Sequence, residues 1–366
     1  MSRVLVFHTG SLGDTIISIP ALRAIRKHWR GQEITLLHNA TPPHLAGPEE
    51  LLSELGLVDK FLTYPATGGS LRRMTGAIRC LCTLRRKQFD TVIYLLRDRP
   101  ADSVRRDGIY FALAGIKVRL GFAAGGNAIP PASKCNETRP ATHQSRSLVR
   151  RLRELGADLD LEGCFEMPLL APSREFRSSA AEFLRKYRVA PERDLAAICP
   201  GAKTSANRWP IIRFVELARR VTSELGWEVI LLGGPADAQS GQMICRSVPG
   251  TIDACGKLSI LEVAAVMELC RVVVGLDTGT THLAAAVGTP VVGIYGARNP
   301  PGQWDPLGQG HRVLRLEVPC EGCGLETCPV PGHPCISGLS VDQVFNAVRR
   351  GATAHGAGDL RRSSSV

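Results

Sequence analysis

Residues 275–296 read GLDTGTTHLAAAVGTPVVGIYG, and the pattern of this segment predicts the fold class. The run VVVGL, which ends at Leu276, and the later run VVGIYG both have the β-branched, apolar composition of buried strands. The Ala-rich segment between them is long enough for a short helix, which Gly288 and Pro290 would end. A strand, a helix and a second strand in this order predict the βαβ unit of a parallel sheet.

The same alternation extends outward along the chain. The strand-like runs LAAICPGA and EVILLGG enclose the amphipathic segment FVELARRVTSEL, which Gly226 closes. A separate series begins with RVLVFHT and continues through ITLLHNA, KFLTYP and DTVIYLL, with amphipathic segments among them. Two such series predict an α/β protein with two Rossmann-like, doubly wound domains that face each other across a cleft.

A length of 366 residues also favours two domains. A polar segment bracketed by Pro172 and Pro191 lies between the two series and predicts the boundary. We therefore expect an N-terminal domain over 1–180 and a C-terminal domain over 181–350. The last residues, 351–366, are small and polar and predict a disordered tail.

The composition is that of a folded globular protein, with 44% hydrophobic and 22% charged residues. No apolar run reaches the roughly 18 residues that a membrane-spanning helix needs. The first residues, MSRVLVFHTG, run directly into a strand pattern without the apolar core of a signal peptide. A cytoplasmic protein is therefore the expectation.

The net charge of +11 is carried by one half of the chain. Residues 1–190 hold 29 Lys and Arg against 18 Asp and Glu, whereas residues 191–366 hold 16 of each. The asymmetry predicts either an anionic partner for the first half or a basic solvated surface. Nucleic acid is a poor candidate partner, because aromatic residues make up only 5% of the chain and none interleave with the basic runs.

The segment DTGTTH, residues 277–282, lies where a predicted strand runs into a helix start, and free N–H groups there favour anions. Gly279 permits close approach of a phosphate or diphosphate, and the hydroxyls of Thr278, Thr280 and Thr281 add donors. Asp277 can accept hydrogen bonds from sugar hydroxyls, and His282 can donate one to a phosphate. The alternative is that Asp277 or Thr278 only caps the helix and that His282 is a satisfied, partly buried side chain.

Two further loops carry polar side chains after predicted strands. In PGAKTSANRWP, Lys203 and Arg208 supply cations for a diphosphate, unless the loop is only solvated. In LLGGPAD, Gly233 allows a close backbone approach to a ligand. Neither loop has the spacing of a dinucleotide or P-loop fingerprint.

The loop after the first predicted strand reads HTGSLGDT and ends at Asp14. Asp14 either caps the helix that follows or accepts a proton from an acceptor hydroxyl as a general base. The residues that would surround that acceptor are Gly10, Ser11 and Gly13.

These motifs in this order resemble those of the ADP-heptose:lipopolysaccharide heptosyltransferases, glycosyltransferase family nine, over roughly residues 1 to 350. The matching segments are VLVFHTGSLGDTIISIPALRAIRKHW, CPGAKTSANRWP, DTGTTHLAAAVGTPVVGIYG and CEGCGLETCPVPGHPC. The resemblance implies a GT-B fold whose first domain binds the acceptor and whose second binds the sugar nucleotide. The implied reaction is an inverting transfer, without a metal or other cofactor, from ADP-L-glycero-β-D-manno-heptose to the lipopolysaccharide inner core.

The resemblance also implies roles for individual residues. Asp14 matches the catalytic base, and Arg208 matches the cation that contacts the donor diphosphate. The donor loop matches at Asp277, Thr278, Gly279 and His282. The acceptor is expected to be anionic, which agrees with the basic first half. Residues 78–87, IRCLCTLRRK, form a basic amphipathic segment that either docks a cytoplasmic enzyme on anionic lipid at the inner leaflet of the inner membrane or, as the preferred interpretation, is a solvated helix face.

Four of the twelve cysteines cluster near the C-terminus, at Cys320, Cys323, Cys328 and Cys335. A similar cluster occurs in members that resemble the second heptosyltransferase of the inner-core pathway, so the resemblance is closer to that type. Four thiols can bind a structural zinc ion. Because the spacing is irregular for a zinc ribbon, reduced thiols packed in a Pro- and Gly-rich loop are the preferred interpretation.

Two other functions fit the same motifs. One is a glycosyltransferase of the same fold that uses a different sugar nucleotide or acceptor, because base and sugar selectivity come from pocket shape. The other is a non-catalytic module that binds a sugar nucleotide.

Overall fold

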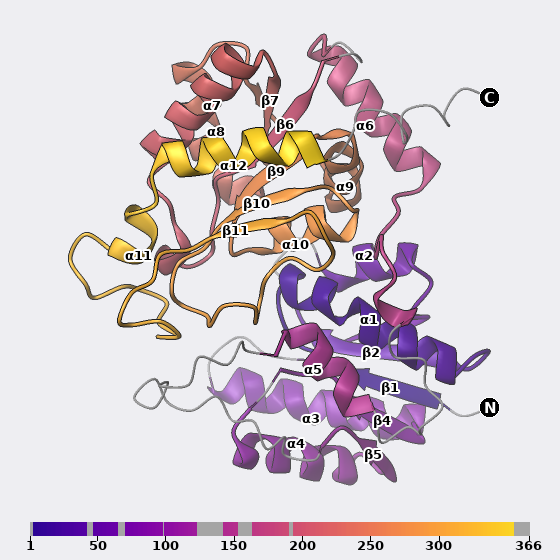
Figure 1. Ribbon diagram of the computed structural model, residues 1–366. Coiled ribbons are helices and arrows are strands. Elements are labelled where there is room, and N and C mark those ends of the chain that lie inside the picture. The colour runs from indigo at the N-terminus through magenta and orange to yellow at the C-terminus, as the bar shows by residue number, and fades with distance from the viewer. Residues whose placement is uncertain are drawn as a thin grey trace. The chain divides into compact units, whose positions relative to one another are not determined.

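The computed structural model describes residues 3–41, 47–64, 70–97, 99–122, 142–152, 163–189 and 193–354. The chain divides into two compact units, Met1–Leu169 and Leu170–Val366. Each unit contains one parallel sheet covered by helices on both faces (Figure 1). This confirms the predicted α/β class with two doubly wound sheets.

The first unit holds a five-stranded sheet in the order β3-β2-β1-β4-β5. Its strands are β1 (Arg3–Phe7), β2 (Glu33–Asn39), β3 (Lys60–Tyr64), β4 (Thr91–Tyr94) and β5 (Val118–Leu120). Its helices are α1 (Leu12–His28), α2 (Pro48–Glu54), α3 (Ser70–Lys87), α4 (Ala101–Leu113) and α5 (Gln144–Arg151), with a 3-10 turn η3 (Gly163–Phe165). Helices α1 and α2 cover one face of the sheet, and α3 and α4 lie side by side on the other (Figure 1).

The second unit holds a six-stranded sheet in the order β11-β10-β9-β6-β7-β8. Its strands are β6 (Leu195–Cys199), β7 (Glu228–Leu231), β8 (Ile252–Asp253), β9 (Val272–Leu276), β10 (Val291–Ile294) and β11 (Arg312–Leu314). Its helices are α6 (Arg174–Lys186), α7 (Ile211–Leu225), α8 (Ala238–Ser247), α9 (Ile260–Leu269), α10 (Gly279–Ala286), α11 (Pro334–Ser337) and α12 (Val341–Ala354). Two 3-10 turns, η4 (Ser205–Asn207) and η5 (Pro235–Asp237), lie in its loops.

The strand, helix and strand predicted from residues 275–296 are β9, α10 and β10. Every residue of β6, β9 and β10 is buried, as expected for parallel strands with helices on both faces. The larger core lies between this sheet and the helices α7 and α12, where Phe214, Val344 and Phe345 pack. The packing on both faces holds β6, β9 and β10 in place, so their carboxyl ends provide a rigid base for the loops that follow them.

Helix α6 belongs to the second unit, so the division falls at Leu169 and Leu170 and not at the expected 180. The Arg177 guanidinium donates two hydrogen bonds to Glu268 on α9, from Nε to Oε2 at 2.8 Å and from Nη2 to Oε1 at 3.0 Å. The Ser179 hydroxyl donates to Glu262 on the same helix. These contacts attach to α9, in the second unit, a polar segment in which the sequence predicts the domain boundary.

The chain's C-terminal region also differs from expectation. Residues 351–354 were assigned to a disordered tail, but they form the last turn of α12. The rest of that tail, residues 355–366, lies outside the described residues. Within the parts of the chain that the structure describes, no helix is both long and apolar enough to cross a bilayer.

Candidate active site

The strand order of the second sheet reverses between β6 and β9, because the chain first adds β7 and β8 on one side and then β9, β10 and β11 on the other. Ligands of doubly wound proteins bind beyond the carboxyl ends of the strands at such a point. Here the two loops that leave these strands are joined directly: Asn207 Nδ2 donates to the backbone oxygen of Asp277 at 2.9 Å. The structure therefore brings together two of the four loops that the sequence singled out, DTGTTH and PGAKTSANRWP.

The turn from β9 into α10 has Thr278 at the N-cap, in extended conformation. The Thr278 side chain makes no capping hydrogen bond to the helix and instead lies 2.9 Å from the Thr280 hydroxyl, oxygen to oxygen. Gly279 is the first residue of the helix. The cap side chain thus leaves the first N–H groups of α10 to another acceptor, which is the arrangement that suits a bound anion.

The expectation that Thr281 adds a hydroxyl for the ligand is wrong. Its side chain is fully buried, and Oγ1 donates to the Leu276 backbone oxygen at 2.6 Å. A side chain on Gly275 would overlap that hydroxyl, so the glycine provides the room it occupies. Thr281 holds α10 against the end of β9 and points away from the helix start.

Asp277 is held in place by a residue that the motif did not include. Asn299, in the loop after β10, donates from Nδ2 to Asp277 Oδ2 at 2.7 Å. Burial raises the pKa of Asp277 above its ordinary value, while the Asn299 bond and the charge of Arg315 act in the opposite direction. Asp277 therefore has a fixed orientation at the strand end, as a group that recognises hydroxyls needs.

His282 lies in the first turn of α10 and is only 4% exposed. Its ring lies against Trp304, with ring centroids 6.3 Å apart and planes tilted by 60°. Direct donation from His282 to a phosphate stays a prediction.

The loop after β7 contains a partly buried carboxylate at the end of the LLGGPAD segment, which the sequence analysis did not single out. Asp237, in η5, accepts a hydrogen bond from the Gly234 backbone N–H at 2.9 Å. A side chain on Gly201 or on Gly233 would overlap the Asp237 carboxylate. Burial raises the pKa of Asp237, with the Gly234 N–H and the charge of Arg208 opposing the shift. Gly233 therefore makes room for this carboxylate, and its close approach to a ligand stays a prediction.

We expect Gly233→Ala to lower the free energy of unfolding by about 1–3 kcal/mol, because the new methyl group meets a packed side chain. Gly234→Ala is the matched control, since its nearest contact would be Asp237 Oδ2 at 4.0 Å, and it should cost less than about 0.5 kcal/mol. Urea unfolding of the two variants measures the difference. On an Asp237→Ala background, the cost of Gly233→Ala should largely disappear; an unchanged cost would exclude this contact as the cause.

The basic residues of the loop after β6 lie at the surface of the second unit. Lys203 and Arg208 are both exposed, and Arg208 Nε donates to the Ala202 backbone oxygen at 3.2 Å. The next residue, Trp209, is buried, and its ring N–H donates to the Leu339 backbone oxygen at 3.0 Å. The buried indole fixes the loop, and the exposed guanidinium beside it can neutralise a negatively charged ligand.

The Cys-rich segment supports these loops. The backbone N–H of Ala206 donates to the Glu326 backbone oxygen at 3.0 Å, and Ser205 Oγ donates to the same oxygen at 3.1 Å. Arg298 Nε, after β10, donates to the Leu325 backbone oxygen at 3.0 Å. Residues 320–328 thus brace both the loop after β6 and the loop after β10.

The zinc site that is the alternative for the cysteines of this segment stays a prediction. Among the described residues, no three His, Cys, Asp or Glu side chains are placed to hold a metal ion. Cys335 is buried in the core, whereas Cys320 is exposed. Burial raises the pKa of the Cys335 thiol, and the nearby thiols of Cys320, Cys328 and Cys323 act in the same direction. All eleven described cysteines are free thiols.

In the first unit, Asp14 is the third residue of α1 and forms a capping box with Ser11, which is the N-cap. Asp14 Oδ2 accepts from the Ser11 backbone N–H at 2.7 Å and from the Ser11 hydroxyl at 2.8 Å. Gly10 must be glycine, because a side chain there would overlap Asp14, and its N–H donates to Asn39 Oδ1 at 2.7 Å. Gly13 is buried inside the helix start. The carboxylate is thus oriented at the carboxyl end of β1.

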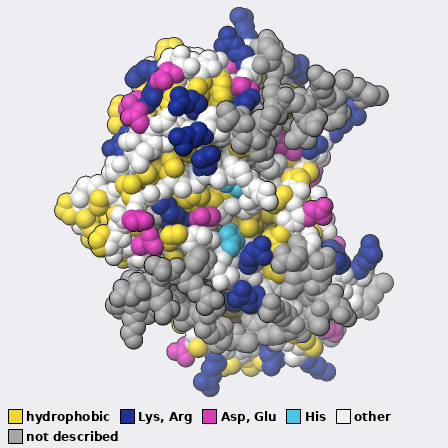
Figure 2. Space-filling model, viewed as in Figure 1, with side chains coloured by type: hydrophobic (Ala, Val, Ile, Leu, Met, Phe, Trp, Pro, Cys, Tyr) yellow, Lys and Arg dark blue, Asp and Glu magenta, His cyan; other side chains and the backbone are white. Residues whose placement is uncertain are grey.

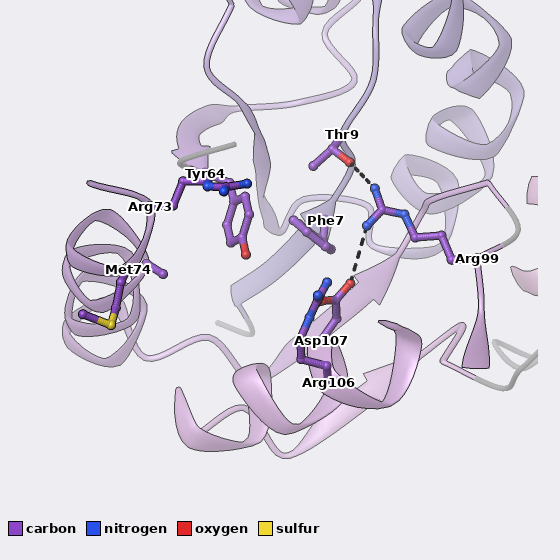
Figure 3. Close-up of a pocket in the computed structure, with 9 residues that line it drawn as sticks. Phe7, Thr9, Tyr64, Arg73, Met74, Arg99, Arg106 and Asp107 are labelled. Atoms are coloured by element: carbon purple, nitrogen blue, oxygen red, sulfur yellow. Dashed lines mark hydrogen bonds and ion pairs between the residues drawn. The ribbon is translucent and has the colours of Figure 1, made fainter. Parts of the chain in front are cut away.

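A cavity of about 540 Å³ opens at the same edge of this sheet, where the strand order reverses between β1 and β4 (Figure 3). Three guanidinium groups line it, from Arg73 on α3, Arg99 after β4 and Arg106 on α4. Phe7 and Tyr64 form an aromatic wall, with ring centroids 5.5 Å apart. From the sequence, only the excess of positive charge in residues 1–190 could be seen, and these individual side chains were not indicated.

One buried carboxylate partly balances the three cations. Asp107 accepts from Tyr94 Oη at 2.9 Å and from Arg106 Nη2 at 3.0 Å, and it lies 3.9 Å from Arg99 Nη1. Arg99 also donates from Nη2 to Thr9 Oγ1 at 3.3 Å, so it connects the cavity to the loop that precedes Asp14. Three cations against one carboxylate leave a positive cavity with an apolar wall, which suits an anionic sugar or another anionic ring-containing group.

Two doubly wound units, each with polar side chains at its strand-order reversal, form the architecture of the GT-B fold. The sequence profile of glycosyltransferase family 9 (heptosyltransferase) matches residues 78–333. The chain belongs to this family.

Individual relatives agree with this assignment. Lipopolysaccharide heptosyltransferase 2 of Salmonella typhimurium is 30% identical over 156 residues, which are 41% of this chain and 44% of the relative. The match therefore spans less than half of that relative. A family 9 glycosyl transferase from Veillonella parvula has the same fold, with a TM-score of 0.75 at 21% identity over 97% of this chain and 98% of that one. The ADP-heptose LPS heptosyltransferase II of Escherichia coli gives 0.65 at 20% identity, over 97% and 99%.

Proposed function

We propose that the protein transfers a heptose from ADP-L-glycero-β-D-manno-heptose to a sugar of the lipopolysaccharide inner core, with inversion at the anomeric carbon. The observation that carries the proposal is the junction of the two loops at the strand-order reversal of the second sheet, where Asn207 holds Asp277 beside the start of α10. Many anions could bind at such a junction; because the chain belongs to a glycosyltransferase family, we infer that the ligand is a sugar nucleotide.

In this proposal, the second unit binds the donor. The first N–H groups of α10 and the guanidinium of Arg208 stabilise the diphosphate, and Lys203 adds a second cation. Asp277, oriented by Asn299, accepts hydrogen bonds from sugar hydroxyls. The adenine base and the heptose are inferred from relatives, one of which is described as acting on ADP-heptose.

Asp14 is the proposed general base. Its Oδ2 is held by Ser11, which leaves Oδ1 to take the proton of the acceptor hydroxyl. The acceptor oxygen then bonds to the anomeric carbon as the bond from that carbon to the diphosphate breaks and ADP leaves. The positive cavity lined by Arg73, Arg99 and Arg106 is the proposed place for an acidic group of the acceptor.

Calorimetric titration with ADP, UDP and GDP tests the donor assignment. We expect ADP to bind at least about tenfold more tightly than UDP and GDP, since the proposed donor site of the second unit should accept only one base. Release of ADP from ADP-heptose in the presence of an inner-core acceptor then tests the reaction. Preferred binding of UDP or GDP would indicate a different donor, and ADP binding without turnover on any core acceptor would indicate a non-catalytic module.

A further inference from the structure

The outer surface of α3 is apolar at positions that do not contribute to the core. Leu71 is 71% exposed, Met74 is 56% exposed and Ile78 is 53% exposed. Spacings of three and four residues place these side chains on one stripe of the helix. The opposite side of α3 packs inward through Cys80 and Leu84. The helix therefore has a second apolar stripe that the fold does not use.

Helix α4 continues this surface. Ile109 and Leu113, four residues apart, are 53% and 54% exposed. The two helices are bonded to each other, since Tyr110 Oη donates to the Ala77 backbone oxygen at 2.8 Å and Arg85 Nε donates to the Leu113 backbone oxygen at 2.7 Å. We refer to Leu71, Met74, Ile78, Ile109 and Leu113 together as the α3–α4 ridge.

Cations surround the ridge. The sequence of α3 contains six Lys and Arg and no Asp or Glu, and Lys117 and Arg119 are exposed just beyond α4. Helix α4 itself carries Asp102 and the buried Asp107 of the cavity. Basic and hydrophobic side chains lie next to each other along the lower edge of Figure 2, where α3 and α4 lie in Figure 1.

This combination is that of a helix which lies in a membrane interface, with apolar side chains at the boundary of the acyl chains and cations on lipid phosphates. A second copy of the chain is a poorer occupant, because the exposed cations of one α3, among them Arg79 and Arg86, would meet those of the other. Charge complementarity therefore selects an anionic surface.

We propose that the α3–α4 ridge docks the protein on an anionic phospholipid bilayer. The same helix supplies Arg73, Met74 and Ala77 to the wall of the positive cavity. When α3 lies on the bilayer, the anionic group of a lipid in that bilayer is therefore close to the cavity. The docking goes beyond the proposed transfer reaction and does not depend on which sugar is moved.

Co-sedimentation with vesicles tests the proposal. We use vesicles of phosphatidylcholine alone and vesicles that also contain phosphatidylglycerol, and we expect the full chain to bind only the second kind. In Leu71→Asp/Ile78→Asp, binding should fall more than about tenfold, because two apolar contacts are lost. Removing charges in Arg79→Gln/Arg86→Gln should weaken binding about fivefold for each charge.

Ile212→Asp is the matched control, because Ile212 is 68% exposed on α7 in the second unit and should not affect vesicle binding. All variants should bind ADP in solution like the unaltered chain, which separates a failure of docking from a failure of the proposed donor site. Equal binding to both kinds of vesicle, or unchanged binding of the Asp variants, would overturn the proposal. So would a dimer in solution that Leu71→Asp/Ile78→Asp dissociates, since the ridge would then be an interface between copies.

Discussion

Asp14→Asn should lower kcat by about 10²–10⁴-fold, the usual contribution of a general base, and leave ADP affinity unchanged. The amide has nearly the shape of the carboxylate, and its oxygen can still accept from the Ser11 N–H that now bonds to Oδ2 at 2.7 Å. The capping box and the start of α1 should therefore persist. Steady-state kinetics with saturating ADP-heptose, alongside an ADP titration, measures both quantities.

Asp14→Ala provides the comparison. It removes the base and the capping contact together, so it should also lower the free energy of unfolding by about 1 kcal/mol. A base is indicated if both variants lose turnover and only the Ala variant loses stability. If Asp14→Asn retains most of its turnover, Asp14 acts only as a cap, and the assignment of the base is wrong.

Arg208→Ala should weaken ADP binding by about 10- to 100-fold, the value of a charge-assisted hydrogen bond to a diphosphate. The side chain is exposed and its loop is anchored by the buried Trp209, so the substitution should leave stability nearly unchanged. Calorimetric titration with ADP and with AMP distinguishes a diphosphate contact from a general effect of charge. AMP, which has only one phosphate, should lose much less affinity.

Arg219→Ala is the control for Arg208→Ala, because Arg219 is an exposed cation of α7 in the same unit. Its removal changes the net charge by the same amount and should leave ADP affinity within about twofold. Equal losses in the two variants would mean that the second unit attracts ADP only through its overall charge.

The sequence was sufficient to predict a strand or a helix where one pattern of side chains repeats over the whole element. The strands β6, β9 and β10 are continuous apolar runs because both of their faces are covered, and Gly288 with Pro290 ends α10. It failed at the unit boundary because α6 is polar overall. Only Ala180 and Leu184 are buried along that helix, and its attachment to α9 depends on hydrogen bonds from Arg177 and Ser179.

Contacts between distant loops could not be predicted from one sequence. Asn299 lies 22 residues after Asp277 and has no distinguishing neighbours, although it determines the orientation of that carboxylate. Gly233 was recognised as a position that needs close approach, but the sequence did not show that Asp237 of the same unit makes such an approach. The cavity of the first unit assembles Arg73, Arg99 and Arg106 from separate elements, so no local spacing marks it.

The brace formed by the Cys-rich segment has a consequence for the order in which the protein is made. Ser205 and Glu326, which it joins, are 121 residues apart, and every strand of the second sheet lies before residue 315. A ribosome therefore releases the complete sheet before it releases the segment that fixes the loop after β6. During synthesis, the loop after β6 reaches its final conformation only after the sheet beneath it has emerged.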